Sequence, residues 1–370
     1  MDEGNGGVRA SERGWRDAYG RLRDYAAAHE GIRLAPRSLT VPPEARPEFY
    51  DLVEQVQRGL TEEVLGPEAE RVREAARRCA AMRGRVLDRS GLAAFHLAPT
   101  LESLMSDADK TLAKPAFALV LDAVGEGSSP EELEAAARRA LPPFCSSLFR
   151  NAYEAWAYLG VVAALEPTRF YAALSSDTEE VRAVRTDEVR AASQVTSPER
   201  RIPEAVFETA DGRVFAMKSE AARELDYYGV RIERRRDSSA GGNTAGLMGH
   251  RVLLLYRLGS VDDVAVTVDR QKRVQTPIDL MCEVLEPHDM SYPAYVSAFV
   301  ERINAARSRR PVQVITFDAS GEFAPGLLDD EAVAPVRRRT VGFDEEKLAD
   351  IAKTLDDRDI DENPLETEEP

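Results

Sequence analysis

The sequence predicts an α+β protein with an all-helical N-terminal domain and an α/β C-terminal domain that has a mixed sheet and a βαβ unit. Through the first 165 residues, apolar side chains recur at three- and four-residue spacing, as on one buried face of a helix. From Arg169 onward the pattern changes to short apolar runs, and strand, helix and strand patterns follow one another between Arg251 and Ser320. We therefore place the domains at 15–165 and 166–320, after a disordered start at 1–14 and before a linker and disordered acidic tail at 321–370.

The bulk composition is that of a folded chain. With 370 residues, 43% hydrophobic and 31% charged, the chain is long enough for two domains. It contains no apolar run of the roughly 18 to 20 residues that span a bilayer, and residues 1–14 have no apolar centre of the secretory type. We therefore expect a cytoplasmic protein that does not associate with membranes. Its three cysteines are far apart, as expected of reduced, partly buried thiols.

The helices of the N-terminal half are read from their apolar stripes. Trp15, Tyr19 and Leu22 mark the first helix, and the proline-rich segment 36–47 predicts an extended linker after it. Further helices are expected at these ranges: 48–65, 68–82, 100–113 and 115–124. Ser129 to Glu132 has the pattern of a capping box, which predicts a helix that ends at Pro142-Pro143. A last, mostly apolar helix is expected from Ser147 to Leu165.

The C-terminal half begins with strand signals. Phe170 to Leu174 predicts a strand, whereas 177–196 is charged with scattered valines and is compatible with either helix or strand. Asp211-Gly212 separates two β-prone runs, and this dipeptide supplies the positive φ of a tight hairpin turn.

The clearest pattern lies between Arg251 and Ser320. Three apolar runs predict strands, namely Val252–Tyr256, Val261–Val268 and Ile278–Leu285. An amphipathic helix from about Pro293 to Arg307 and the strand Val312–Phe317 follow. A strand, a helix and a strand in this order predict a crossover onto a parallel or mixed sheet.

Acidic side chains lie on or beside two of these predicted strands. They include Asp262, Asp263, Asp279 and Glu283. Carboxylates that converge at a sheet edge can bind Mg²⁺, which prefers oxygen ligands and retains water for hydrolysis. The candidate catalytic and metal-binding residues are therefore Asp263 and Glu283.

In this respect residues 150–318 resemble the restriction-endonuclease-like nuclease fold with its PD-(D/E)XK signature. The resemblance assigns the first acid to Asp263 and the second to Glu283, and it implies a Mg²⁺-dependent nuclease or an inactive relative. The chain departs from the signature at two positions. Leu285 stands where the family has the lysine that assists the attacking water, and Asp262 stands in place of the proline. Ordinary surface carboxylates are the alternative interpretation of these residues.

The charge of the chain is concentrated at its end. Of the net charge of −16, residues 342–370 carry −9, because twelve acidic residues stand against three basic ones. The total charge of −16 disfavours nucleic acid as a partner, but the remaining 341 residues carry only −7, so nucleic acid stays an open alternative. Within the tail, 344–355 predicts a short amphipathic helix with Leu348, Ile351 and Leu355 on one side. These three residues are the candidate partner-binding residues, and the acidic run would steer them to a basic surface or an apolar groove of a protein partner. A solubilising end without a partner is the alternative.

The sequence contains no complete catalytic motif. The four histidines are scattered, and the serine-elbow, P-loop and dinucleotide patterns are missing. The leading hypothesis is therefore a non-catalytic interaction or adaptor protein of a larger intracellular assembly, without a cofactor. The alternative is the Mg²⁺-dependent nuclease or its inactive relative.

Overall fold

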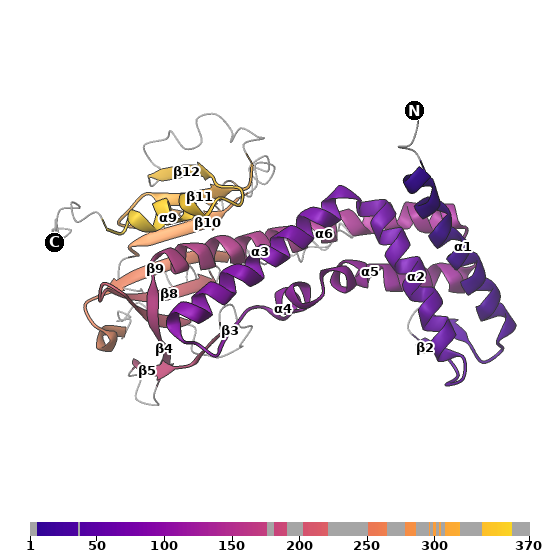
Figure 1. The fold of residues 1–370 in the computed structure, drawn as a ribbon, viewed down its shortest axis with the longest axis horizontal. Helices are drawn as coiled ribbons and strands as arrows, with labels where there is room; N and C mark the ends of the chain where they lie inside the picture. Colours follow the sequence, from indigo (N-terminus) through magenta and orange to yellow (C-terminus); the bar gives the residue numbers. More distant parts are fainter. Residues whose placement is uncertain are drawn as a thin grey trace, which may run out of the picture. The chain divides into compact units, whose positions relative to one another are not determined.

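A computed structural model describes residues 6–35, 38–175, 181–190, 203–220, 251–264, 278–285, 308–318 and 335–356, together with 296, 299, 300, 303 and 304. The α+β fold is confirmed: helices dominate the first 165 residues and a mixed sheet follows (Figure 1). The chain divides into two compact units, Met1–Ala80 with Pro99–Tyr153, and Ala81–Ala98 with Glu154–Pro370. No helix in the described ranges is long and apolar enough to cross a membrane.

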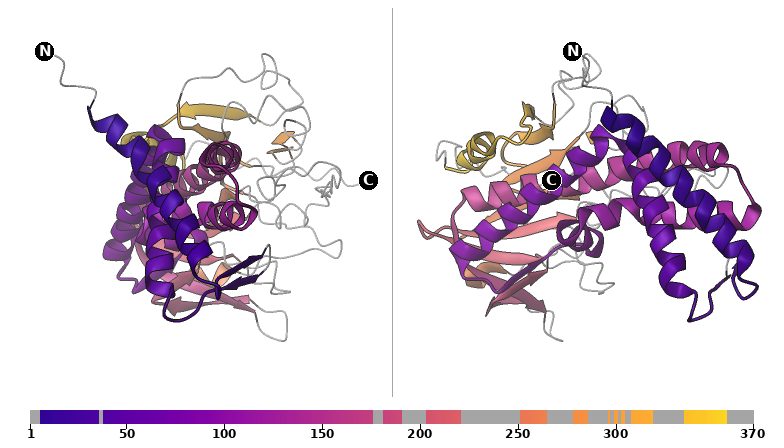
Figure 2. Two further views of the ribbon diagram at one scale, coloured as in Figure 1. Left: turned by 90° about the vertical axis from the view of Figure 1, so that its right-hand side faces the viewer. Right: turned by 45° about the vertical axis from the view of Figure 1, so that its right-hand side comes forward.

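In its described residues the first unit is helical apart from the antiparallel pair β1 (Arg33–Ala35) and β2 (Ser38–Thr40). Its helices are α1 (Gly6–Ala28), α2 (Arg46–Leu65), the start of α3 (Pro67–Ser90), α4 (Pro99–Ser106), α5 (Ala108–Glu126) and the first part of α6 (Pro130–Ala164). Helices α1 and α2 lie side by side (Figure 2). Trp15 of α1 packs closely on α2, because a Cβ added at Gly59 would lie only 2.7 Å from the Cβ of Trp15. The predicted apolar faces form the core, in which Trp15, Tyr19 and Leu22 are buried.

The main differences between the predicted and the observed helices of this half occur at prolines. The predicted helix end at Pro142-Pro143 is wrong, because α6 continues through both residues to Ala164. Burial of the flanking Leu141 and Cys145 offsets the cost of the lost helical hydrogen bonds. Pro115 likewise lies inside α5, and the break comes earlier, where the side chain of Asp107 caps the helix by accepting from Lys110 N at 2.9 Å. The capping box is confirmed: Ser129 N donates to Glu132 Oε2 at 2.8 Å.

The second unit is built on an eight-stranded sheet with the order β12-β11-β10-β9-β8-β7-β4-β5. The bounds are β4 (Pro167–Ser175), β5 (Val181–Thr186), β7 (Ala205–Thr209), β8 (Val214–Glu220), β9 (Arg251–Leu258), β10 (Leu280–Val284), β11 (Val312–Thr316) and β12 (Val336–Thr340). The β10–β11 and β11–β12 pairs are parallel and the others antiparallel. A separate parallel pair joins β3 (Ala94–His96) to β6 (Glu188–Arg190). The undecided range 177–196 therefore contains β5 and β6.

The later parts of α3 and α6, which belong to this unit, lie along one face of the sheet, which we call the helix face (Figure 1). Phe170, Phe207 and Phe215 form an aromatic row across β4, β7 and β8, and Phe95 meets Phe170 edge-on. On the other face lies a core cluster that includes Leu254, Met281, Phe299 and Ile303. Phe299 and Ile303 lie in the predicted 293–307 helix, most of which is outside the described residues.

Two expectations for this half need correction. The run Val261–Val268 does not begin as a strand, because Val261–Val264 forms a 3-10 turn, η3, directly after β9; residues 265–268 lie outside the described residues. The short helix predicted at 344–355 is confirmed as α9 (Glu345–Lys353), but residues 335–356, expected within a linker and tail, also include the strand β12. The parallel pairing of β12 with β11 makes this segment part of the sheet. The acidic run 357–370 lies outside the described residues.

Candidate functional site

Glu283, the second predicted acid, lies inside the second unit. It is 0% exposed in the middle of the sheet, where β10 pairs it with Val252 of β9 and Val314 of β11. Because paired residues share a face, its side chain lies on the face of the core cluster that contains Val252 and Val314. A carboxylate in this position is not presented at an accessible sheet edge.

Asp263, the first predicted acid, has a local role. It lies in η3, is exposed, and its Oδ2 accepts a hydrogen bond from Ser260 N at 2.8 Å. An aspartate that bonds the backbone three residues earlier stabilises a turn, here the one that ends β9.

The structure does not bring Asp263 and Glu283 together. Strand β9 runs antiparallel to β10, so Glu283 lies opposite Val252 near the start of β9, whereas Asp263 follows its end at Leu258. Six residues at about 3.3 Å each place the two carboxylates at least about 20 Å apart, too far to share a metal ion. Among the residues that the structure describes, no group of three His, Cys, Asp or Glu side chains can bind a metal.

The polar neighbours of Glu283 come from a distant part of the sequence. Tyr158 of α6 accepts a hydrogen bond from Val284 N at 3.2 Å through its hydroxyl oxygen. Burial, and then the nearby Glu154 and Glu283 carboxylates, raise the pKa of Tyr158 well above its ordinary value. Glu154, one helical turn before Tyr158, is 1% exposed. The buried side chains of Glu154, Tyr158 and Glu283 attach α6 to β10. Because each is at most 6% exposed, a substrate cannot reach them.

The lysines considered as partners of the two acids are placed as follows. Lys218 is buried in β8 opposite Leu254, which in turn pairs with Met281. It therefore lies two strands away from β10, on the same face as Glu283. Lys272 lies outside the described residues.

The predicted partner-binding residues Leu348, Ile351 and Leu355 are buried within this chain. Leu348 packs against Gly160 of α6, and Arg85 of α3 pairs with Glu345 of α9. The expectation that these side chains are free to enter a partner's groove is wrong, because they already fill the core of the second unit. The amphipathic pattern is real, but its apolar face is covered intramolecularly.

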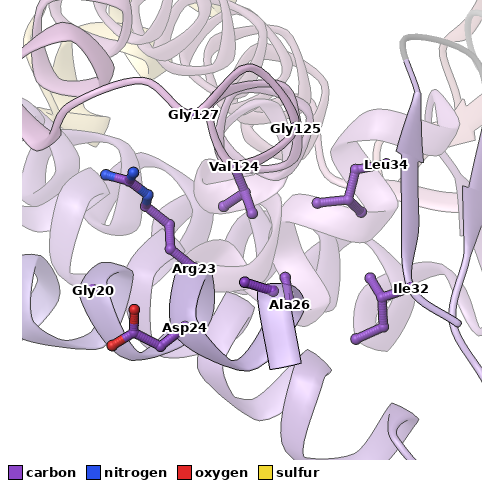
Figure 3. A pocket seen from close by; sticks show the side chains of 10 residues that line it. Gly20, Arg23, Asp24, Ala26, Ile32, Leu34, Val124, Gly125 and Gly127 are labelled. Atoms are coloured by element: carbon purple, nitrogen blue, oxygen red, sulfur yellow. The ribbon is translucent and has the colours of Figure 1, made fainter. Parts of the chain in front are cut away.

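The first unit carries an open hollow of about 580 Å³ between α1, β1 and the end of α5 (Figure 3). Ile32, Leu34 and Val124 form its apolar part, and Arg23 and Asp24 lie on α1 beside it. Both charged residues are exposed, so water and salt screen their contribution to binding. The hollow has the volume of a small-molecule site but lacks buried polar groups that would fix a ligand.

A second accessible feature is the edge strand β5. We define the β5 surface as Leu174, Arg182, Val184 and Arg185. The pairing of β4 with β5 places Leu174, Arg182 and Val184 on the helix face, where Leu174 is 45% and Val184 40% exposed. Arg182 and Arg185 are exposed and form no ion pair with any described residue. Within the described strands, β5 pairs on one side only, with β4.

A shallow hollow of about 270 Å³ adjoins the end of β5. It is lined by residues that include Arg169, Arg185 and Asp187. Arg169 lies 3.6 Å from the Glu208 carboxylate, so Arg185 is the cation of this hollow that has no described carboxylate partner. The β5 surface thus combines exposed apolar side chains with arginines that have no carboxylate partner among the described residues, at an edge that no described strand covers.

Comparison with protein-family models, with curated proteins and with solved structures finds no match to this chain. We therefore infer the β5 surface from the residues of this chain alone. The sequence did not predict this surface, although the charged pattern with valines at 177–196 contains the strand that forms it.

Proposed function

We propose that this chain is a non-catalytic protein-interaction protein, an adaptor that receives an extended acidic segment of a partner at the β5 surface. The observation that carries the proposal is the outer edge of β5, which no described strand covers, with Leu174, Arg182 and Val184 exposed on one face and Arg185 exposed on the other. Such an edge offers backbone donors and acceptors to a further strand, and its side chains select the sequence of that strand.

The positive charge of the β5 surface indicates that the partner segment is acidic. A segment that alternates apolar and acidic residues would place its apolar side chains on Leu174 and Val184, on the helix face, and its carboxylates beside Arg185, on the other face. Each cross-strand pair of this kind contributes roughly 0.2 to 1 kcal/mol, and the backbone hydrogen bonds add to that. Exposed ion pairs are screened by salt, so binding should weaken as salt rises.

The test uses a dye-labelled ten-residue peptide of alternating valine and glutamate, titrated with the full chain at low salt and followed by fluorescence anisotropy. The double variant Arg182→Glu, Arg185→Glu should weaken binding at least tenfold. The matched control is Arg58→Glu, because Arg58 is an exposed arginine of α2 whose described ion pair is with Glu54. Equal peptide binding by all three chains would refute the proposal. An equal loss of peptide binding in the double variant and in the Arg58→Glu control would refute it too.

A further inference from the structure

We propose that the chain's own acidic C-terminal segment, residues 357–370, occupies the β5 surface and competes with the partner. This inference rests on the proposed function, because it names the regulator of the same surface. The segment contains seven acidic residues against one basic residue, Arg358, and it includes the apolar Leu365. Its composition matches that of the acidic, partly apolar strand the β5 surface would bind.

The structure shows where this segment leaves the folded unit. Asp356 pairs with Arg213, which lies in the turn between β7 and β8. The guanidinium of Arg213 is 5.6 Å from the ring centroid of Phe215, a member of the aromatic row on the helix face. The C-terminal segment therefore starts on the same sheet face as Leu174, Arg182 and Val184.

The distance from this starting point to the β5 surface is short. From β8 the sheet order passes β7 and β4 to β5, which is three strand spacings of about 4.8 Å. The register adds about three to four residues along the strands, so Val184 lies about 20 Å from Arg213. Nine residues separate Asp356 from Leu365, and an extended chain of that length spans about 30 Å. Leu365 can therefore reach Val184.

The opposite edge strand, β12, is the competing place for the segment. It carries Arg337, Arg338 and Arg339, and it lies about 28 Å from Arg213 by the same construction, within reach of Leu365. Its positive charge is already partly compensated. The Asp350 carboxylate of α9 is near Arg339 and Arg337, which lower its pKa after the larger effect of Lys353. Arg339 also donates to the neutral side chain of Gln313 at 2.8 Å. Among the described residues, β12 also lacks a large exposed apolar side chain such as Val184.

The experiment is disulfide trapping in the full chain. All three native cysteines are buried, so they should not compete with the introduced thiols. One variant carries Val184→Cys with Leu365→Cys, and its matched control carries Arg337→Cys with Leu365→Cys on the exposed residue of β12. Under mild oxidation at low protein concentration, the Val184 variant should form an intramolecular disulfide at least ten times faster. Adding Arg182→Glu and Arg185→Glu should abolish the difference.

Three outcomes overturn the inference: equal rates in the two variants, faster trapping at residue 337, or disulfide-linked dimers in place of the intramolecular product. A binding measurement separates this failure from failure of the proposed function. If all seven acidic residues of 357–370 are replaced by their amides, the valine–glutamate peptide should bind at least tenfold more tightly than to the parent chain. Peptide binding that needs Arg182 and Arg185 without trapping at Val184 refutes the intramolecular contact alone. Trapping without any peptide binding refutes the proposed partner function alone.

Discussion

Gly160 in α6 and Leu348 in α9 are in direct contact, because the glycine leaves no side chain between the two helices. A Cβ placed at Gly160 would overlap Cδ1 of Leu348 and lie 3.1 Å from Cε of Met82. All three residues belong to the second unit, and Leu348 and Met82 are buried. The glycine therefore sets how closely α9 can approach the rest of its unit.

We predict that Gly160→Ala lowers the free energy of unfolding by about 1 to 3 kcal/mol, the usual cost of an added methyl group in a packed core. The measurement is urea unfolding followed by circular dichroism. Because the added carbon displaces Leu348, trypsin should also cleave at Lys347 and Lys353 faster than in the parent. The control is Gly84→Ala in α3, which has no atom within 4 Å of its added Cβ. That change should stabilise by about 0.5 to 1 kcal/mol, and an equal loss in both variants would contradict the packing argument.

Tyr158→Phe should destabilise the chain by about 1 to 3 kcal/mol at pH 7, because it removes the hydroxyl that accepts from the buried Val284 N. The effect should shrink at high pH. The folded state holds the phenol proton well above pH 10, whereas unfolded tyrosine ionises near 10, so the parent loses stability as pH rises through that range. The phenylalanine variant lacks this loss.

Unfolding curves of the parent and of Tyr158→Phe at pH 7 and pH 10.5 test this convergence. Tyr50→Phe is the control, since Tyr50 is 41% exposed. A gap between parent and Tyr158→Phe that widens with pH would be incompatible with a buried, protonated phenol.

Asp211 should contribute a small, acid-sensitive part of the stability. The hydrogen bond from Thr209, and then the contacts with Arg213, lower the pKa of Asp211 to about 2. Its contribution is therefore present above about pH 4 and is lost as pH falls through 2. The carboxylate is more than half exposed, so the solvent-screened contribution is only about 0.5 to 1 kcal/mol.

Asp211→Asn should remove this acid-dependent contribution and flatten the stability curve between pH 5 and pH 2. Thermal unfolding at several pH values measures it. Asp262→Asn removes an exposed carboxylate that forms no ion pair within the described residues, and it should leave the curve of the parent unchanged. If both variants follow the parent at low pH, the Asp211 contacts contribute nothing to stability.

The features that the sequence predicts well are those whose cause is local. The hairpin at Asp211-Gly212 forms because Gly212 adopts a φ of +83°. Residues with a Cβ rarely adopt this backbone conformation. Ser129 and Glu132 bond to each other's backbone within one turn. In both cases three or four neighbouring residues contain the whole physical cause.

The features that depend on register or on distant partners could not be read in this way. Asp263 and Glu283 are 20 residues apart in sequence, but only the antiparallel register of β9 and β10 shows that they lie at opposite ends of the sheet. Tyr158 meets Val284 across 126 positions, and no pattern near either residue signals the contact. β12 is an edge strand rich in arginine, so it lacks the apolar alternation by which strands are recognised.

The three cysteines should be unreactive in the folded chain. Cys79, Cys145 and Cys282 are buried. Burial raises the pKa of the Cys145 thiol to about 11, and it raises the pKa of Cys282 further against the opposing effect of Arg339. Since the thiolate is the reactive form, neither should react appreciably at pH 8.

Ellman's reagent should therefore label none of the three within minutes in buffer and all three in 6 M guanidinium, about the concentration that unfolds even very stable domains. The exposed thiol of Val184→Cys serves as the control and should react at once. Rapid labelling of a native cysteine in buffer would show that its part of the core opens readily.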